Sequence, residues 1–297
     1  MTLGLLIFAK TPEMTPTIFK RVADTYKIHG VQYPESIDFA GESVPLYDAD
    51  VRERLDREFL VNTYWQSNAL LLIKRSEKYY PVIDSILEAN GVPSDFKYLA
   101  LAESGLENVV SPAGAAGFWQ IMTNTAREYG LKVNNQIDER YHLIKSTVTA
   151  CKYLKKWHTE FGSWTLTAAA YNLGPNGLKR RIEEQKVKRY YDLQLPSETS
   201  RYIFRILAIK EIVSKPDQYG FKLVDNDYYR YPKTKRVELK ESVTDLNELA
   251  LELNTNYKWF KKLNPWLRKN SLELSEGESL FIEVPKEAMQ KTTEPSD

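Results

Sequence analysis

The sequence predicts a mainly α-helical protein in which a large helical domain is followed by a small α+β module. Apolar residues recur three or four positions apart between about residues 51 and 220, and no convincing pair of strands interrupts them. After residue 228 the pattern changes to strand, helix, helix, strand within about fifty residues. The chain of 297 residues is also too long for one ordinary core, which favours more than one domain.

The chain is expected to open with an extended leader over residues 1–48, where four prolines occur with little apolar periodicity. Helical periodicity begins at Val51, and the helical domain is expected to occupy residues 49–224. Within it, a loop with two glycines covers residues 111–117. Capping residues, glycines and prolines bound the helices. These helices are expected over residues 51–90, 95–104, 123–129, 146–161, 164–172, 178–185 and 197–213.

The C-terminal module is expected to occupy residues 235–285. Asp245 can cap its first helix, with Glu248 at the position of a capping box. The polar tail that follows, residues 286–297, is expected to be disordered. The elements of the module are expected over residues 236–240, 245–253, 257–263 and 279–284.

The composition is that of a soluble globular protein and excludes some classes of partner. The net charge is +1, from 41 basic and 40 acidic side chains, so no basic excess points to nucleic acid. With a single cysteine, Cys151, the chain forms no intrachain disulfide. Three histidines and one cysteine supply no cluster of metal ligands, and neither a metal nor an organic cofactor is expected.

Glu103 is the first candidate for chemistry. It stands at the C-terminal end of an apolar helix and is followed by Ser104 and Gly105. Burial by the apolar neighbours and the partial negative charge of the helix end both disfavour the ionised carboxylate and raise its pKa. A carboxylic acid that is still protonated near neutral pH can protonate a glycosidic oxygen. Taken alone, this feature favours a solvent-facing acid at a helix end over a catalytic one.

Three further segments could line a binding cleft. The glycine-rich loop lets the backbone approach a ligand closely, and a helix end after small residues presents a tyrosine and an asparagine. Another helix begins with an acid that is followed four residues later by a tyrosine. Each segment also has a purely structural interpretation. The loop could be a tight turn, the tyrosine could be a packed core ring, and the acid could simply be favourable in a first helical turn. The candidate side chains are Gln120, Met122, Tyr171, Asn172, Glu198 and Tyr202.

The order and spacing of these segments are more specific than any one of them. The chain contains Glu103-Ser104, then Ser111-Pro112-x-Gly114-Ala115-x-Gly117-x-Trp119-Gln120-x-Met122, then Ala170-Tyr171-Asn172-x-Gly174, then Glu198-Thr199-x-x-Tyr202. This set closely resembles the lytic transglycosylases of the soluble and membrane-bound type D group, which share the goose-type lysozyme fold. The resemblance covers roughly residues 45 to 222 and implies a lysozyme-like fold for the helical domain.

The resemblance implies a peptidoglycan substrate and a single catalytic acid. Family members use the glutamate at the position of Glu103 to protonate the oxygen between N-acetylmuramic acid and N-acetylglucosamine. The same group then takes the proton of the muramic 6-hydroxyl, which attacks its own anomeric carbon and leaves a 1,6-anhydro end. No second carboxylate is then needed to activate water. Ser104 and Ser111 are expected to form hydrogen bonds around the acid and the sugar, and the six candidates above to line the cleft.

The sequence departs from the family pattern at three places. Thr123 stands where the family usually has proline, and the loop between Glu103 and Ser111 is one residue shorter than in many members. His142-Leu143 stands where an Asp-Pro pair is common. This last change puts a structural contact in doubt, not the chemistry.

The C-terminal module resembles a divergent LysM repeat, a small domain that binds glycans containing N-acetylglucosamine. Leu263-Asn264-Pro265 and Leu280-Phe281-Ile282 carry the resemblance. The glycine-aspartate opening that is typical of the repeat is missing. The module is therefore expected either to bind sugar or to act as a degenerate spacer.

Two other functions stay open. A lysozyme-type hydrolase of the same fold would need a second carboxylate near the cleaved bond, and Glu198 is the candidate for it. A non-catalytic protein that binds the wall or acts as a scaffold would have no need of Glu103.

The expected partners are the glycan strands of peptidoglycan, and the expected location is the bacterial cell envelope, in the periplasm, as inferred from the substrate. The apolar run over residues 3–9 is too short to span a bilayer, and no basic residue precedes it. Association with a membrane is expected only through an N-terminal signal or anchor that is missing or truncated.

Overall fold

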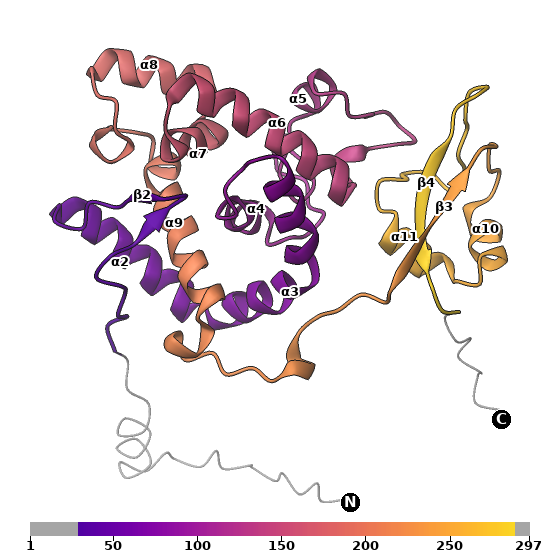
Figure 1. Cartoon of the computed structure of the whole chain (residues 1–297), viewed down its shortest axis with the longest axis horizontal. Coiled ribbons are helices and arrows are strands. Elements are labelled where there is room, and N and C mark those ends of the chain that lie inside the picture. Colours follow the sequence, from indigo (N-terminus) through magenta and orange to yellow (C-terminus); the bar gives the residue numbers. More distant parts are fainter. Residues whose placement is uncertain (1–28, 289–297) are drawn as a thin grey trace, which may run out of the picture. The chain divides into compact units, whose positions relative to one another are not determined.

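The computed structural model describes residues 29–288 (Figure 1). Residues 1–28 of the expected leader and residues 289–297 of the expected tail lie outside the described residues. Residues 33–288 belong to one compact unit, to which the following description applies.

Helices form nearly all of the regular structure between residues 49 and 214. The α-helices are α2 (Ala49–Tyr64), α3 (Gln66–Ala89), α4 (Phe96–Ser104), α5 (Thr123–Glu128), α6 (Leu143–Phe161), α7 (Trp164–Leu173), α8 (Pro175–Gln185) and α9 (Ser197–Ser214). Short 3-10 helices cover Glu139–Tyr141, Tyr190–Asp192, Pro216–Tyr219 and Asp225–Asp227. Before α2, the expected leader contains an antiparallel pair of very short strands, β1 (Asp38–Phe39) and β2 (Glu42–Ser43).

Helix α4 lies in the middle of the helical domain, with α3 and α9 packed against it (Figure 1). Its sequence explains this position, because a short helix that is apolar on almost all sides has to be buried. Phe96, Leu99 and Ala100 are completely shielded from solvent. Burial of one large apolar side chain contributes about 1.5–3 kcal/mol. The C-terminal end of α4, where Glu103 lies, is therefore held firmly by the core.

Gly105 ends α4 as the sequence predicts. Its φ of 60° is left-handed, and its N–H donates to the Leu101 carbonyl at 2.8 Å. Glycine adopts this conformation without the steric penalty that other residues meet.

Two helices begin three residues earlier than the sequence predicts. Helix α6 begins at Leu143 and not at residue 146, because His142 acts as its N-cap, accepting at Nδ1 from the Lys145 N–H at 3.5 Å. Histidine is not among the usual N-cap residues, so the pattern gave no signal for it. Helix α8 begins at Pro175 and not at residue 178, since a proline in the first turn removes only an N–H that has no partner within the helix.

The C-terminal module has the expected order of strand, helix, helix, strand. Its elements are β3 (Thr234–Leu239), α10 (Leu246–Glu252), α11 (Tyr257–Leu263) and β4 (Leu280–Pro285). The two strands pair antiparallel, from Thr234 opposite Pro285 to Leu239 opposite Leu280. Asp245 caps α10 by accepting from the Asn247 N–H at 2.7 Å. The prediction of a mainly α-helical protein with a small α+β module is confirmed.

The module shares a hydrophobic core with part of the helical domain. Phe260 and Ile282 of the module are completely buried, and Tyr141 of the helical domain belongs to the same apolar cluster. The main chain adds a polar contact, because the Asp138 N–H donates to the Trp266 carbonyl at 2.9 Å. The module is thus tied to the segment that precedes α6.

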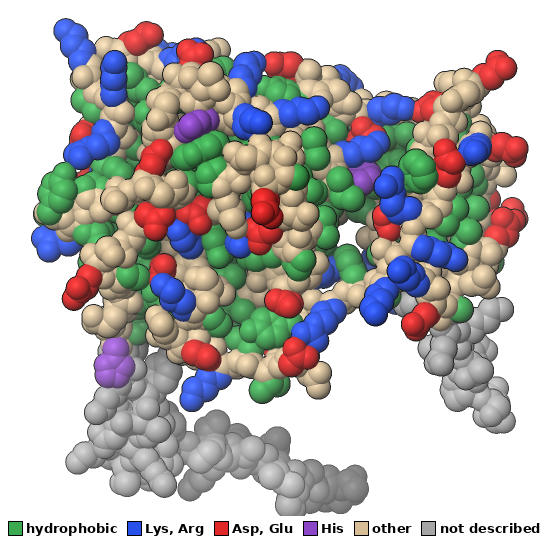
Figure 2. All heavy atoms as spheres, in the orientation of Figure 1, with side chains coloured by type: hydrophobic (Ala, Val, Ile, Leu, Met, Phe, Trp, Pro, Cys, Tyr) green, Lys and Arg blue, Asp and Glu red, His purple; other side chains and the backbone are tan. Residues whose placement is uncertain are grey.

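The surface carries charges of both signs. On the face that Figure 2 shows, Lys and Arg side chains are interspersed with Asp and Glu side chains, in keeping with the net charge of +1. Among the described helices, none has the length and hydropathy that a bilayer span requires.

Candidate active site

Glu103 lies in the last turn of α4, where its side chain is partly buried. The Tyr202 hydroxyl donates a hydrogen bond to its Oε1 atom. Tyr202 comes from the first half of α9 and is almost completely buried. Two helices that are anchored in the core therefore hold the carboxyl group and its hydrogen-bond donor in fixed positions.

The pKa of Glu103 is raised above its ordinary value, in the direction that the sequence predicts. The largest cause is burial, which penalises the charged carboxylate. The hydrogen bond from Tyr202 lowers the pKa, the negative charge of Glu198 raises it, and the positive charge of Arg205 lowers it. Burial outweighs the two stabilising neighbours, so the protonated acid persists to higher pH than in an ordinary glutamate.

Two serines secure the backbone around Glu103. The Ser104 hydroxyl donates to the Phe118 carbonyl at 2.9 Å and accepts from the Leu106 N–H at 3.1 Å, which joins the end of α4 to the glycine-rich loop. The Ser111 hydroxyl accepts from the Ala115 N–H at 3.0 Å and so closes that loop on itself. The structure thus links Ser104 to the acid's surroundings and Ser111 to the loop backbone.

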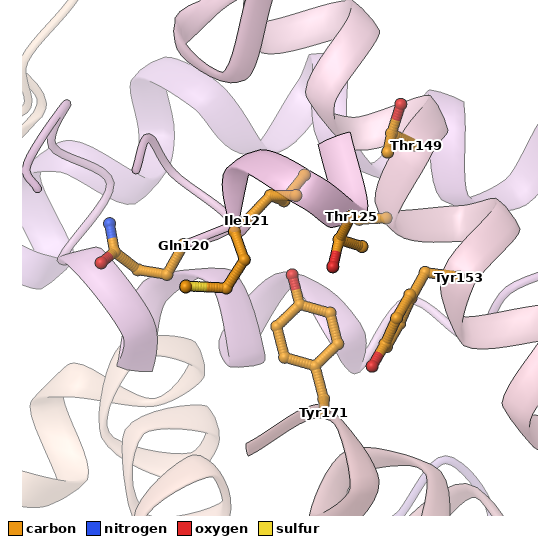
Figure 3. Close-up of a pocket in the computed structure, with 8 residues that line it drawn as sticks. Gln120, Ile121, Thr125, Thr149, Tyr153 and Tyr171 are labelled. Carbon is orange, nitrogen blue, oxygen red and sulfur yellow. The ribbon is translucent and has the colours of Figure 1, made fainter. Parts of the chain in front are cut away.

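Three of the candidate side chains, Gln120, Met122 and Tyr171, meet at a small cavity of about 70 Å³ (Figure 3). The Tyr171 hydroxyl points toward the loop and donates to the Trp119 carbonyl at 2.5 Å. The Gln120 amide donates to the Gly117 carbonyl at 2.8 Å. These contacts hold Gln120 against the loop, while Met122 is 45% exposed and offers an apolar surface.

Asn172 and Glu198 form a second polar group. The Asn172 amide nitrogen donates to Glu198 Oε1 at 3.3 Å, and its Oδ1 accepts from the Thr199 hydroxyl at 2.7 Å. Glu198 is exposed and affects the pKa of Glu103 through its charge. Thr199 is buried and was not among the predicted site residues, although it directly follows Glu198 in the motif.

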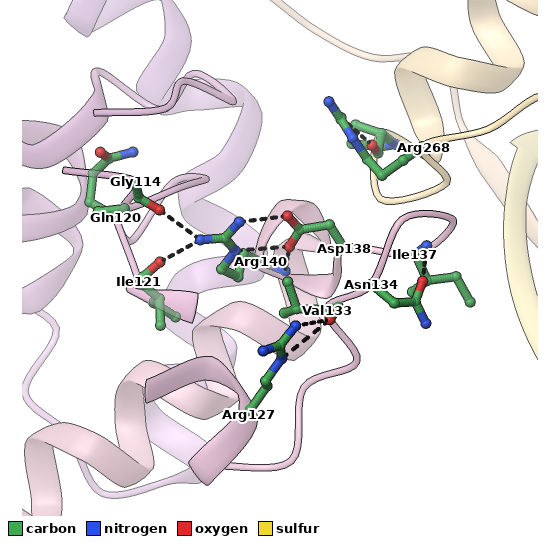
Figure 4. Close-up of polar contacts among 12 residues, drawn as sticks. Gly114, Gln120, Ile121, Arg127, Val133, Asn134, Ile137, Asp138, Arg140 and Arg268 are labelled. Atoms are coloured by element: carbon green, nitrogen blue, oxygen red, sulfur yellow. Dashed lines mark hydrogen bonds and ion pairs between the residues drawn. The ribbon is translucent and has the colours of Figure 1, made fainter. Parts of the chain in front are cut away.

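Sequence reasoning missed the support of the glycine-rich loop by Arg140 (Figure 4). The Arg140 guanidinium donates to the Gly114 carbonyl at 2.8 Å and to the Ile121 carbonyl at 3.2 Å. Its other nitrogen atoms bind Asp138 at 2.7 and 3.0 Å, and both residues are less than 10% exposed. A buried ion pair that satisfies two loop carbonyls fixes the loop's position.

Gly117 makes the same loop depend on close backbone packing. A Cβ atom at this position would lie 2.1 Å from the Arg140 carbonyl oxygen, and the residue has a φ of 78°. Only glycine fits here, because any side chain would collide with main-chain atoms.

Arg205 is a further residue that the sequence analysis did not select. It lies three residues after Tyr202 on α9, so both side chains project from neighbouring positions of the helix surface. Its charge lowers the pKa of Glu103. The helical spacing from Tyr202 was the signal that could have identified it.

Among residues 29–288, no group of three or more His, Cys, Asp or Glu side chains is arranged to hold a metal ion. The raised pKa of the partly buried Glu103 carboxyl group suits it to proton transfer.

Comparison with known proteins agrees with this geometry. Residues 82–194 match the family model of the transglycosylase SLT domain, and residues 235–288 match that of the soluble lytic transglycosylase C-terminal LysM-like domain. The chain is 30% identical over 218 residues to the membrane-bound lytic murein transglycosylase D of Escherichia coli K12 and, to the same extent, to that of Escherichia coli O6:H1.

These alignments cover 71% of this chain and 47% of each relative, so the chain spans about half the length of the curated relatives it matches. The SLT match agrees with the lysozyme-like fold expected for the helical domain. The chain therefore carries a transglycosylase SLT domain followed by a LysM-like domain of the soluble lytic transglycosylase type.

Proposed function

We propose that this protein is a lytic transglycosylase that cleaves the β-1,4 bond between N-acetylmuramic acid and N-acetylglucosamine in peptidoglycan. The observation that carries the proposal is the environment of Glu103, whose pKa is raised by burial and whose carboxyl group accepts a hydrogen bond from Tyr202. The SLT match over residues 82–194 and the likeness to murein transglycosylase D support the same substrate class.

In the proposed reaction Glu103 acts twice. The protonated carboxyl group first donates its proton to the glycosidic oxygen, and the bond from that oxygen to the muramic anomeric carbon breaks. The muramic 6-hydroxyl attacks the same carbon, and its proton passes to the Glu103 carboxylate. The products are a glycan with a free N-acetylglucosamine 4-hydroxyl and one with a 1,6-anhydromuramic end. Glu103 is protonated again, so the cycle closes without water.

The surroundings of Glu103 suit both steps. Burial keeps the acid protonated for the first step. Once it has lost its proton, the Tyr202 hydroxyl and the positive charge of Arg205 stabilise the carboxylate that must act as base. An attack within one bound sugar also gains the advantage of an intramolecular reaction.

A lysozyme-type hydrolase is the second candidate function, and one observation favours it. Glu198 is a carboxylate that acts on Glu103 through its charge, and Asn172 holds it at 3.3 Å. A hydrolase could use it to activate water. If Glu198→Gln abolished bond cleavage to the same extent as a loss of Glu103, this second function would be favoured.

Digestion of purified cell-wall sacculi tests the role of Glu103. We expect Glu103→Gln to lower the release of soluble fragments by about 10²- to 10⁴-fold, the usual contribution of a general acid and base. Glu128→Gln is the matched control, since Glu128 lies on α5 with its side chain 62% exposed and should not affect turnover. Unchanged release by Glu103→Gln would favour a non-catalytic wall-binding protein instead.

The proposed substrate places the protein in the bacterial cell envelope, with glycan strands as its partners. We propose that residues 49–224 form the catalytic domain and that residues 235–285 form the module that either binds sugar or spaces the domain from the wall. The LysM-like match over residues 235–288 supports this division.

A further inference from the structure

A hollow of about 420 Å³ lies beside the candidate active site, and Glu103 itself is not part of its lining. Its lining includes Arg201 and Arg205 from α9 and, from the corner between α2 and α3, Trp65. Ala102 and Ser104, the two neighbours of Glu103 in the chain, form its end. The hollow therefore begins next to the catalytic acid.

Three arginines line this hollow, and two of them are paired within the protein. Arg201 Nε lies 2.8 Å from Glu58, and Arg75 Nη2 lies 2.5 Å from Glu107. Arg205 is partly buried and forms no hydrogen bond or ion pair with any residue that the structure describes. A guanidinium that is partly desolvated and unpaired favours an anionic ligand, which it can bind through two parallel hydrogen bonds.

The lining of the hollow also includes large apolar side chains that are exposed. Trp65 is 61% exposed, and the neighbouring Val61 and Leu71 are 42% and 38% exposed. Large apolar side chains that gather at the rim of a cavity mark a contact surface for a ligand or partner. The hollow thus combines a guanidinium that has no hydrogen-bonded or ion-paired partner among the described residues with an aliphatic and aromatic surface.

Arg205 also connects the hollow to the reacting group. It lies one helical turn from Tyr202, whose hydroxyl donates to Glu103 Oε1, and its charge lowers the pKa of Glu103. An anion bound to Arg205 would consequently lie within reach of the sugar on which Glu103 acts.

We propose that this hollow binds the peptide stem of peptidoglycan, with Arg205 pairing with a stem carboxylate and Trp65 covering the stem's aliphatic part. This inference rests on the proposed function, because it takes wall glycan as the substrate. A short peptide with free carboxylates and methyl groups matches both the guanidinium and the apolar side chains of the lining. A bare glycan without charged groups would use Trp65 as a stacking surface but would leave Arg205 unpaired.

Binding measurements in the Glu103→Gln background test this inference apart from catalysis. Two glycan fragments of equal length serve as ligands, one with its stems and one stripped of them by an amidase, in which the lactyl carboxylate that this cleavage exposes is then capped as an amide. We expect the full-length Glu103→Gln protein to bind the stem-bearing fragment about tenfold more tightly in calorimetry, as one charge-assisted pair would provide. Adding Arg205→Gln should remove this preference while the dissociation constant of the stripped fragment stays unchanged.

Three further variants make the test specific. Arg180→Gln changes the charge equally on α8, where the side chain is 69% exposed, and should preserve the preference. Arg205→Lys keeps the charge and should retain part of the preference. Trp65→Ala removes an exposed ring and should weaken the binding of the stem-bearing fragment only. This variant keeps the test valid if Arg205→Gln lowers the stability of the protein.

A preference that survives both Arg205→Gln and Trp65→Ala would overturn the inference. If these substitutions weakened the binding of both fragments equally, the inference would also be overturned, because the hollow would then bind the sugar and not the stem. The proposed function fails on a different observation, namely the retention of wall cleavage by Glu103→Gln, so the two failures can be told apart.

Discussion

Glu103 owes its raised pKa to burial, and the hydroxyl of Tyr202 opposes that effect. The sequence indicated the first half of this balance, since an acid at the end of an apolar helix is expected to be hard to ionise. The contact with Tyr202 could be expected only from the family resemblance, because 98 residues lie between the two positions. The part played by Arg205 was missed, although it lies one helical turn from Tyr202.

Replacing Tyr202 by phenylalanine should shift the pH dependence of wall cleavage. The hydroxyl stabilises the ionised Glu103, so its loss raises the pKa of Glu103 further. Because the first step needs the protonated acid, the alkaline limb of kcat/KM should move to higher pH, and activity should fall about tenfold or more. Turbidity assays of sacculi across the pH range measure both effects.

The matched control is Tyr80→Phe, which removes a buried hydroxyl that has no hydrogen-bond partner among residues 29–288. Its pH profile should follow that of the unchanged protein. An alkaline limb that stays in place in Tyr202→Phe would show that the hydroxyl does not control Glu103.

The glycine-rich loop is the element on which the site depends. The sequence correctly predicted that its glycines lie in a loop, but the physical reason for having glycine differs between the two positions. Gly117 packs against the Arg140 main chain, whereas Gly114 has open space around it. This distinction, like the support from Arg140, depends on a segment more than twenty residues further along the chain and could not be predicted from local pattern.

Gly117→Ala should destabilise the fold far more than Gly114→Ala. Both positions have a left-handed φ, 78° and 87°, and each alanine there pays a backbone penalty of about 1–2 kcal/mol. At Gly117 the collision with the Arg140 carbonyl adds overpacking, so the total loss in unfolding free energy should be about 3 kcal/mol or more. Urea unfolding of both variants measures the difference, and equal losses would contradict the packing shown for Gly117.

At the scale of the whole molecule, the two domains are joined through the segment before α6. His142 lies there, with its ring 5.5 Å from that of Trp266 in the module. The sequence marked His142 as a departure from the family pattern and left the contact at this position in doubt. The structure shows that the histidine caps α6 and packs against the module, two roles that only the folded arrangement reveals.

His142 should make stability depend on pH. Burial, followed by the charge of Lys145, lowers the pKa of His142 to about 4 from its ordinary 6.5. Between these values the unfolded chain binds more protons than the folded one, so stability rises with pH through this window and is lost as pH falls toward 4. The loss attributable to His142 is about 2–3 kcal/mol.

His142→Asn keeps a side-chain acceptor for the N-cap and removes the titration. Unfolding by urea at pH 7 and at pH 4 should therefore show a smaller acid-induced loss in this variant than in the unchanged protein. An identical loss in both proteins would mean that His142 is not the group responsible.

The central claim is that Glu103 directs the muramic 6-hydroxyl, and not water, to the anomeric carbon. Mass spectrometry of wall fragments released in water enriched in heavy oxygen tests it most directly. We predict muramic ends that are lighter than reducing ends by one water and carry no heavy oxygen. Reducing ends labelled with heavy oxygen would contradict the account and would identify the protein as a hydrolase.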